Sequence, residues 1–232
     1  MGQIMTFKQK VAVITGAGSG IGRALALALA EQGCHLALSD INQLSLDETA
    51  TFIRQSQKSN AAEIQIHTQA FDVGDEKAFL SFKESVLHVF TKVDFVFNNA
   101  GVSLVQPAPL LETEDLEWIM RINFWGIVYG TQAFLPEMIK KDSGTIINIS
   151  SLFGLLGWPK NAAYCASKFA VRGFTEALRL DLFDTKVRLV TVHPGGVRTQ
   201  IVENARVAQT IGQNTKTENA KSQLAKQFSK IA

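Results

Sequence analysis

Cysteine and histidine are scarce in this chain, and their spacing predicts no metal centre. The 232 residues include two cysteines, Cys34 and Cys165, and four histidines that stand far apart. Two isolated cysteines make neither a disulfide framework nor a metal-ligand motif. Such cysteine usage is typical of a protein in a reducing compartment. We therefore expect a cytoplasmic protein without a metal ion.

Long apolar runs and runs of one charge are also missing. No segment reaches the roughly 18 consecutive apolar residues of a membrane-spanning helix, and the first ten residues lack the apolar stretch of a secretory signal. The 23 basic and 21 acidic residues are intermixed and leave a net charge of +2. A nucleic-acid-binding protein carries a basic patch that this chain lacks. The expected partners are therefore neither membranes nor nucleic acids.

What the chain does have is an alternation of strand-like and helix-like segments. Most of the strand-like segments are continuously apolar, as in parallel sheets covered on both faces, and strand–helix alternation builds right-handed βαβ units. The fold class that follows is α/β, with a single Rossmann-type, doubly wound parallel sheet and helices on both faces. Expected strands cover residues 10–15, 35–40, 63–71, 93–98, 145–150 and 187–193. Expected helices cover residues 20–33, 44–57, 75–90, 113–140 with a bend at Pro136, and 161–182.

The C-terminal part of the chain has a different character. With 46% hydrophobic residues, the whole chain can build one sizeable core, so residues 1–232 are expected to form one domain. From Glu203 onward the sequence is polar, rich in Gln, Asn and Lys, and predicts no strand. We expect residues 200–232 to form a mobile helical flap, or a partly disordered one, on the substrate side.

A glycine-rich turn separates the first expected strand from the first expected helix. Glycines let the backbone approach a pyrophosphate closely, and the helix N-terminus offers free N–H groups and a positive dipole end. The strict G-x-G-x-x-G string is absent, and a glycine-rich turn by itself is a weak signal. Its place between strand and helix makes a dinucleotide site the stronger interpretation. The expected phosphate-side contacts are Gly16, Gly18, Ser19, Gly20, Ile21 and Gly22.

Asp40 ends the second expected strand, 18 residues after Gly22. At that place an acidic side chain meets the adenosine ribose hydroxyls and repels a 2′-phosphate. No lysine or arginine stands at Ser19 or Ile41 to offset this charge, and Arg23 is less well placed. The sequence therefore favours NAD over NADP, while a loop or helix-capping role remains the alternative for Asp40.

Seven short motifs follow one another in order between residues 8 and 200. They are Thr15, Gly16, Gly20 and Gly22; Asn98-Asn99-Ala100-Gly101; Asn123; Ser151; Tyr164-x-x-x-Lys168; Pro194-Gly195; and Thr199. Each motif alone is common, but their order and spacing are specific. In this pattern the chain resembles the classical short-chain dehydrogenase/reductase family. The resemblance implies an NAD(P)-dependent dehydrogenase or reductase acting on a small alcohol or carbonyl compound.

The chemistry at Tyr164 and Lys168 can also be argued from the residues. Four positions apart, the two side chains share one helix face. A tyrosine with its usual pKa near 10 is a poor base, and a nearby ammonium together with an oxidised nicotinamide ring lowers that pKa. Tyr164 then serves as general base towards an alcohol, or general acid towards a carbonyl. Ser151, at the end of the fifth strand, can hydrogen-bond the substrate oxygen, with Ser150 as the competing candidate.

Further site residues are implied by the resemblance alone. The family's lysine, here Lys168, holds the nicotinamide ribose, and Asn123 holds a water that relays protons to Lys168; a buried helix asparagine that satisfies backbone groups is the alternative. The implied adenine and ribose contacts are Asp72, Val73, Asn99, Ala100 and Gly101. The implied contacts to the nicotinamide carboxamide are Pro194, Gly195, Val197 and Thr199.

The loops around the expected site are apolar and point to a hydrophobic or acetoin-type alcohol or ketone. The alternative is that these residues pack against the flap or another subunit. By resemblance, the long helices carrying Asn123 and Tyr164 pair with a second copy, which implies a homodimer or homotetramer. Relative to the family, a seventh strand is missing after the flap, as in a truncated form. Two other functions remain open, a cofactor-binding sensor without turnover and a sugar-nucleotide epimerase.

Overall fold

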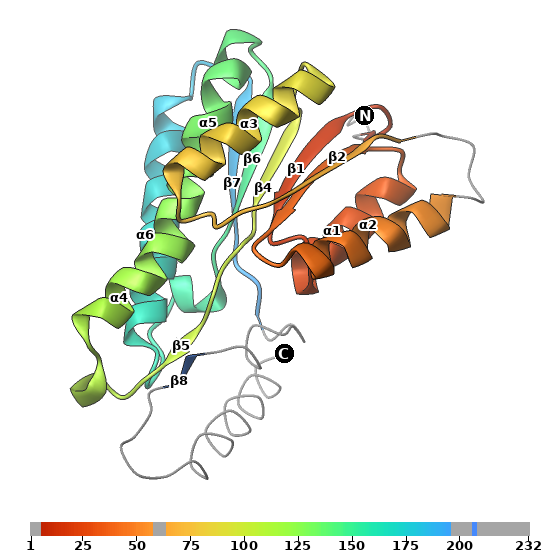
Figure 1. The fold of residues 1–232 in the computed structure, drawn as a ribbon. Helices are drawn as coiled ribbons and strands as arrows, with labels where there is room; N and C mark the ends of the chain where they lie inside the picture. Colours follow the sequence, from red (N-terminus) through yellow and green to blue (C-terminus); the bar gives the residue numbers. More distant parts are fainter. Residues whose placement is uncertain (1–5, 58–63, 196–205, 208–232) are drawn as a thin grey trace.

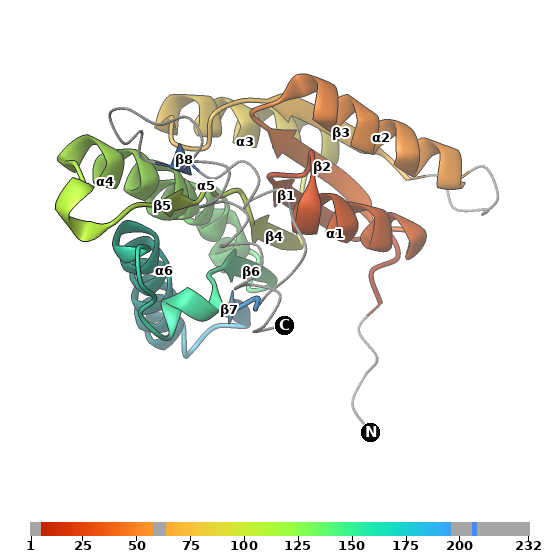
Figure 2. The same ribbon diagram turned by 90° about the horizontal axis from the view of Figure 1, so that it is seen from below.

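The computed structural model describes residues 6–57, 64–195 and 206–207. Six parallel strands form the main sheet in the order β3-β2-β1-β4-β6-β7, with helices on both of its faces (Figures 1 and 2). The strands are β1 (Val11–Thr15), β2 (His35–Asp40), β3 (Ile66–Ala70), β4 (Phe95–Asn98), β6 (Gly144–Ile149) and β7 (Val187–Val192). The expected doubly wound parallel sheet is confirmed.

Two helices cover one face of the sheet and the remaining long helices cover the other (Figure 2). On the first face lie α1 (Gly20–Glu31) and α2 (Gln43–Gln57). On the second lie α3 (Glu76–Phe90), α5 (Gly126–Lys140) and α6 (Ala162–Asp181), with α4 (Thr113–Met120) leading into α5. The right-handed crossovers expected between parallel strands produce this two-sided arrangement.

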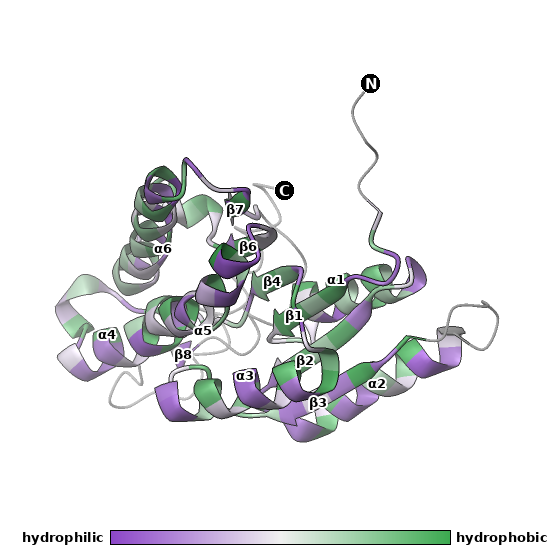
Figure 3. Cartoon of the chain, turned by 90° about the horizontal axis from the view of Figure 1, so that it is seen from above, coloured by the Kyte–Doolittle hydropathy of each residue, from purple (hydrophilic) through white to green (hydrophobic). Residues whose placement is uncertain are grey.

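The alternation of side chains along β1 explains why its sequence is apolar without interruption. Val11 and Val13 belong to the core beneath α3 and α5, whereas Ala12 and Ile14 belong to the core beneath α1 and α2. Successive strand residues point to opposite faces, so a strand covered on both sides needs an apolar residue at every position. In Figure 3 the central strands are accordingly green, and purple residues recur along α2 and α3.

Seven strand boundaries differ from the sequence predictions, each by one to three residues. β4 begins at Phe95 rather than residue 93; the Asp94 backbone still hydrogen-bonds Val11 and Thr145, and its carboxylate also accepts the backbone N–H of Val11 at 3.0 Å. β3 begins at Ile66 rather than residue 63, and β7 ends at Val192 rather than residue 193.

The long helix expected over residues 113–140 is not one regular α-helix. A π-helical segment, Arg121–Trp125, joins α4 to α5, and Pro136 lies inside α5. A π-bulge has no hydropathy signature, so periodicity could not reveal it, and such bulges recur at functional sites.

The prediction of no strand after residue 203 is wrong. Arg206–Val207 forms β8, which pairs in parallel with β5 (Leu104–Val105) below the carboxyl ends of the main sheet (Figure 1). Two residues are too few to produce an alternating pattern, so this pairing depends on tertiary contacts. The other residues of the expected flap lie outside the described part of the chain.

Candidate functional site

A cavity of about 390 Å³ lies at the carboxyl ends of the strands. This edge is where ligands bind in open α/β sheets, next to the point at which the strand order reverses. Here β1 lies between β2 and β4, so chain segments leave the sheet in both directions. Fifteen of the sequence-predicted site residues line the cavity: Gly16, Ser19, Gly20, Ile21, Asp40, Asp72, Val73, Asn99, Ala100, Gly101, Ser151, Tyr164, Lys168, Pro194 and Gly195.

The turn between β1 and α1 forms one end of this cavity. Gly16 and Gly20 have φ values of +66° and +52°, in the left-handed region that favours glycine. Ser19 caps α1 with extended backbone and no side-chain cap bond, so the first N–H groups of α1 are free for an anion. These features fit the phosphates of a dinucleotide.

Gly18 and Gly22 do not line the cavity; both allow close packing behind it. A Cβ on Gly22 would lie 2.1 Å from the carbonyl oxygen of Gly16 and 2.7 Å from Nδ2 of Asn99. A Cβ on Gly18 would lie 2.8 Å from the Asp40 carboxyl carbon. The two glycines thus hold the turn against the strands on either side of it.

Asp40 lies at the end of β2 with its carboxylate against the glycine-rich turn. Oδ2 accepts the N–H of Gly18 at 2.9 Å, and Oδ1 accepts the N–H of Asn42 at 3.0 Å. These bonds match the loop role that was the alternative for Asp40, whereas the side chain of Asn42 accepts the N–H of Ser45 at the start of α2. The Asp40 side chain also lines the cavity. The Arg23 guanidinium is already occupied, because it donates hydrogen bonds to the carbonyl of Gly18 and to Thr49 Oγ1.

Asn99 and Ala100 join the second half of the sheet to the first at the cavity floor. Their backbone N–H groups both donate to Thr15 Oγ1 at 3.0 Å, and Asn99 Nδ2 donates to the Thr15 carbonyl at 2.9 Å. Gly101 follows, and a Cβ there would lie 3.5 Å from Nζ of Lys168. The Asn-Asn-Ala-Gly motif is therefore held beside the cavity by contacts with Thr15 of β1 and lies next to Lys168 of α6.

Asp72 and Val73 line the cavity after β3. The Asp72 carboxylate accepts the N–H of Gly74 at 2.8 Å and an Nη1–H of Arg121 at 2.8 Å. Arg121 begins the π-helical segment, and sequence reasoning missed it because a lone arginine in a helical pattern resembles a solvated surface residue. Val73 is buried in the core under α5.

Tyr164, Ser151 and Lys168 come together at the other end of the cavity. The side chains of Tyr164 and Ser151 are hydrogen-bonded. Lys168 Nζ lies 5.8 Å from the Tyr164 ring centroid and donates to the Ile149 carbonyl at 3.0 Å. Figure 1 shows why they converge: α6 begins beside the end of β6. This arrangement can move a proton to or from a bound oxygen.

Burial shifts the pKa of both groups. It raises the pKa of Tyr164 above its usual value, and the hydrogen bond from Ser151 opposes this only in part. The Lys168 pKa is lowered by burial to about 8. In the protein by itself Tyr164 is therefore a neutral donor, whereas the sequence argument expected a lowered pKa. The difference arises because desolvation of the phenolate is the largest influence on this pKa and outweighs the hydrogen bond from Ser151.

The two candidate serines have distinct environments. Ser150 Oγ donates to the Lys168 carbonyl at 2.9 Å, which ties β6 to α6. Ser151 Oγ accepts the N–H of Phe153 and contacts Tyr164. His193 Nδ1 lies 3.0 Å from the Ser151 carbonyl and was not anticipated from the sequence. Both serines line the cavity, and Ser151 is the one whose side chain contacts Tyr164.

Asn123 is fully buried in the π-helical segment and does not line the cavity. Its Oδ1 accepts the N–H of Val102 at 2.8 Å, and its Nδ2 donates to the Val102 carbonyl at 3.0 Å and to Ser167 Oγ at 3.1 Å. The alternative interpretation, an asparagine that satisfies backbone groups, describes these contacts. Through them Asn123 holds the Val102 segment beside the cavity.

Two predicted contacts cannot be placed. Val197 and Thr199 lie outside the described residues. Among the lining residues absent from the sequence-based set are Phe71, Ser103, Ile122 and Ile149, which are apolar or neutral residues without a motif.

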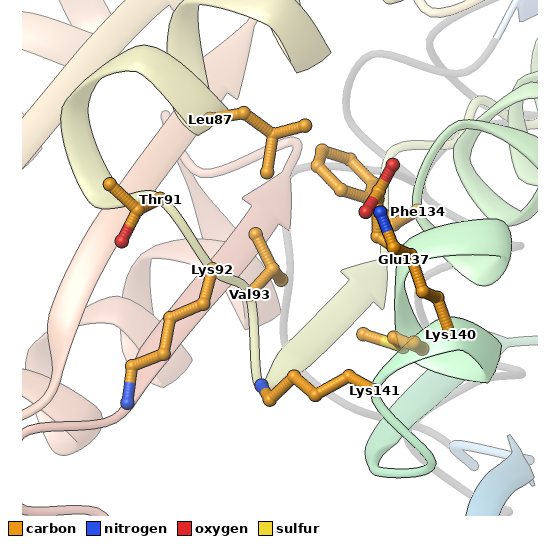
Figure 4. Close-up of a pocket in the computed structure, with 9 residues that line it drawn as sticks. Leu87, Thr91, Lys92, Val93, Phe134, Glu137, Lys140 and Lys141 are labelled. Carbon is orange, nitrogen blue, oxygen red and sulfur yellow. The ribbon is translucent and has the colours of Figure 1, made fainter.

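A second hollow of about 290 Å³ lies at the opposite end of the sheet, between the C-terminal ends of α3 and α5. Figure 4 shows Leu87 and Phe134 facing each other across it. Its lysines Lys92 and Lys141 pair with the buried Asp94 at 3.8 and 3.5 Å. These lysines therefore neutralise a structural carboxylate.

The described residues contain no group of three or more His, Cys, Asp or Glu side chains that could hold a metal ion. Within the same ranges, no helix has the length and apolar character needed to cross a membrane. Cys34 and Cys165 are free and buried, and burial raises the pKa of the Cys34 thiol to about 12.

The sequence profile described as short chain dehydrogenase matches residues 10–210. The chain belongs to this family. Short-chain dehydrogenases are oxidoreductases with a nicotinamide dinucleotide as cofactor, and the cavity residues fit such a cofactor.

Relatives and solved structures of short-chain dehydrogenases agree with this assignment. The chain is 46% identical to SadH of Mycobacterium tuberculosis, an oxidoreductase by name, over 90% of this chain and 75% of SadH. It is 34% identical to cyclopentanol dehydrogenase of Comamonas testosteroni, over 84% of this chain and 75% of that enzyme.

Two crystal structures show the same fold with different dinucleotides. A short-chain dehydrogenase/reductase from Burkholderia phymatum, in complex with NAD, has a TM-score of 0.86 and 30% identity, covering 96% of this chain and 81% of that one. A metagenomic short-chain oxidoreductase in complex with NADP has a TM-score of 0.76 and 30% identity, covering 82% of this chain and 84% of that one.

Proposed function

We propose that this protein transfers a hydride between NAD and a neutral, apolar secondary alcohol or its ketone. The observation that carries the proposal is the hydrogen-bonded pair of Tyr164 and Ser151 beside the buried Lys168, at the end of a cavity whose other end fits a dinucleotide. The bound nicotinamide ring supplies or accepts the hydride.

The side chains of Ser151, Tyr164 and Lys168 have separate roles in this reaction. Ser151 Oγ holds the substrate oxygen and Tyr164 Oη moves the proton. In ketone reduction the raised pKa suits Tyr164, because a neutral phenol donates the proton. In alcohol oxidation the protonated Lys168 amine and the bound cationic ring favour the phenolate. We assign the nicotinamide ribose to Lys168 and the carboxamide side to the Pro194–Gly195 turn.

The substrate end of the cavity favours an uncharged compound. Besides Ser151, Tyr164 and Lys168, the lining at this end includes Val102, Ser103, Pro194 and Gly195, while the carboxylates that line the cavity are those of Asp40 and Asp72 at the dinucleotide end. A cationic substrate would be desolvated beside the Lys168 amine without an acidic partner, and an anionic one would compete with the nicotinamide ribose for that amine; desolvation without a partner costs several kcal/mol. The name of the cyclopentanol dehydrogenase relative supports a cyclic secondary alcohol.

The direct test is the absorbance of reduced nicotinamide during incubation with a panel of substrates. The panel contains cyclic and linear secondary alcohols, acetoin-type hydroxyketones, and matched carboxylated analogues, each with NAD and NADP. We expect turnover of the uncharged compounds. Tight dinucleotide binding without turnover of any panel member would instead identify a sensor, and absence of dinucleotide binding would refute the cofactor assignment.

Asp40 is expected to set the preference for NAD. In Asp40→Ser, the loss of two charge-assisted hydrogen bonds to the adenosine ribose should lower kcat/KM for NAD by about 10- to 100-fold. Removing the negative charge should raise kcat/KM for NADP, because the 2′-phosphate is no longer repelled. Arg23 is occupied elsewhere, so NADP should remain a modest cofactor.

Steady-state kinetics with both dinucleotides measures this shift, and Asp47→Ser on the exposed surface of α2 is the matched control. An unchanged ratio of NAD to NADP efficiency in Asp40→Ser would mean that Asp40 serves only as the cap for Asn42 and Gly18.

We propose further that a second copy of the chain covers α6. Six exposed residues form one small and apolar stripe along this helix: Ala162, Ala166, Phe169, Gly173, Ala177 and Leu180. Their spacing of three and four positions puts them on one face, and a Cβ on Gly173 meets nothing within 4 Å. A two-fold axis would set one stripe against its own copy.

Light scattering of the purified protein should therefore give twice, or four times, the mass of one chain. In Gly173→Glu the measured mass is expected to fall to that of one chain, because pairing of two α6 helices would bury two like charges. Gly157→Glu, at an equally open glycine, serves as the control. A monomeric wild type would contradict the pairing.

A further inference from the structure

The β5–β8 pair brings two distant segments together beside the cavity. Leu104 and Val105 of β5 are in register with Arg206 and Val207 of β8, and the Arg206 N–H donates to the Ser103 carbonyl at 3.0 Å. Ser103 itself lines the cavity. A backbone pairing of only two residues is weak by itself, so side chains must hold it in place.

Arg206 supplies these side-chain contacts. Its Nη1 lies 3.0 Å from Oδ1 of Asp115, whose side chain is only 11% exposed, and its guanidinium carbon lies 5.3 Å from the ring centroid of Trp118. Asp115 and Trp118 are both on α4, one turn apart. An ion pair and a stacked ring on the same face fix the plane of a guanidinium, which a lysine cannot reproduce.

The contact continues from β5 into the catalytic end of the cavity. Leu104 is 2% exposed and belongs to one buried cluster with Phe153 and Tyr164. One residue earlier, Ser103 lines the cavity, and Val102 is held by Asn123 on its other side. The segment Val102–Leu104, of which Val102 and Ser103 line the cavity, is thus held at one end by Asn123 and at the other by Arg206.

We propose that Arg206 is a positioning residue for substrate. Through β5 it sets where Leu104 packs against Tyr164 and where the Val102–Ser103 wall meets the substrate; this inference rests on the proposed dehydrogenase function. The contacts of Arg206 are with Ser103, Asp115 and Trp118, whereas the dinucleotide end of the cavity is formed at the ends of β1, β2 and β4. Loss of Arg206 should therefore affect the alcohol and spare the dinucleotide.

The ion pair also bears on the charge beside the substrate end. Asp115 is buried, and a buried carboxylate without a partner would be strongly destabilising. Arg206 satisfies it, and the pair adds no net charge next to the cavity. The Arg206–Asp115 ion pair is therefore compatible with a neutral substrate, and it determines the position at which β8 pairs with β5.

The test uses the full-length protein with the variants Arg206→Ala, Arg206→Lys and Asp115→Asn, and the exposed Arg188→Ala on β7 as the matched arginine control. We expect Arg206→Ala to lower kcat/KM for the alcohol about tenfold, mostly through KM, a size typical of coupled contacts. The affinity for NADH should stay within about twofold, since its end of the cavity is separate. Arg206→Lys should recover part of the loss, because it retains the charge.

Two structural measurements accompany the kinetics. Hydrogen exchange at Leu104 and Val105 should accelerate in Arg206→Ala and Asp115→Asn, and not in Arg188→Ala. Tryptophan fluorescence should change in Arg206→Ala, and this change should vanish in a Trp118→Phe background, since the guanidinium no longer stacks there.

The outcomes separate the two proposals. If the wild type turns over no substrate but exchange at Leu104 and Val105 accelerates in Arg206→Ala, the dehydrogenase function fails while the contact through β5 stands. Unchanged exchange or unchanged substrate KM in Arg206→Ala overturns the positioning role. A parallel loss of NADH affinity also overturns it, because that result means a general disturbance of the fold.

Discussion

Replacing Tyr164 by phenylalanine is expected to lower kcat/KM for the alcohol about 10³-fold, within the usual range for a lost general acid or base. The substitution removes Oη and its hydrogen bond to Ser151. It keeps the ring, which packs edge-on against Phe153 at 6.2 Å between centroids, so the fold and NADH binding should be retained. Initial rates and NADH fluorescence titrations measure the two effects separately.

Tyr129→Phe is the matched control, because Tyr129 is the other of the two tyrosines in the chain and stacks on Trp125 away from the cavity. In the wild type, alcohol oxidation should rise with pH as the phenol loses its proton, and ketone reduction should fall. If Tyr164→Phe kept more than about one tenth of the wild-type kcat/KM and the same pH dependence, the proton transfer would belong to another group.

The second large effect is expected from Gly22→Ala. The added Cβ would lie 2.1 Å from a backbone oxygen of Gly16, and neither backbone can yield without moving the turn. Such overpacking costs about 1–3 kcal/mol of unfolding free energy. Displacement of the turn by about 1 Å should weaken dinucleotide binding about 100-fold, the order found for misplaced binding groups.

Urea unfolding and NADH titration would measure both losses. Gly157→Ala is the control, because a Cβ there meets nothing within 4 Å. A Gly22→Ala protein with wild-type stability and wild-type affinity for NADH would show that the added Cβ does not displace the turn. Loss of stability with retained affinity would restrict Gly22 to helix–strand packing.

The sequence was informative wherever a pattern repeats along the chain. The six parallel strands follow from continuous apolar runs, since β1 alternates between two cores and needs an apolar residue at every position. The catalytic end follows from the spacing of Ser151, Tyr164 and Lys168, and these residues do meet.

Sequence reasoning failed where a role depends on one contact between distant segments. Gly18 and Gly22 look like phosphate ligands in the motif, yet their neighbours are Asp40 and Gly16. Arg206 stands in a polar stretch without strand periodicity, and only its meeting with Asp115, 91 positions earlier, gives it a role. A π-helical turn such as Arg121–Trp125 similarly leaves no mark on hydropathy.

The parallel pairing of β1 with β4 has a consequence for folding kinetics. Thr15 and Asn99 are 84 positions apart and form hydrogen bonds at the junction between the two halves of the sheet. Closing so long a loop costs entropy before the contact is gained, which makes this step slow. Because the dinucleotide cavity spans the same junction, a bound cofactor joins both halves. At 100 times its dissociation constant, a bound dinucleotide would add about 2.7 kcal/mol to the unfolding free energy and would thereby stabilise the junction between the two halves of the sheet.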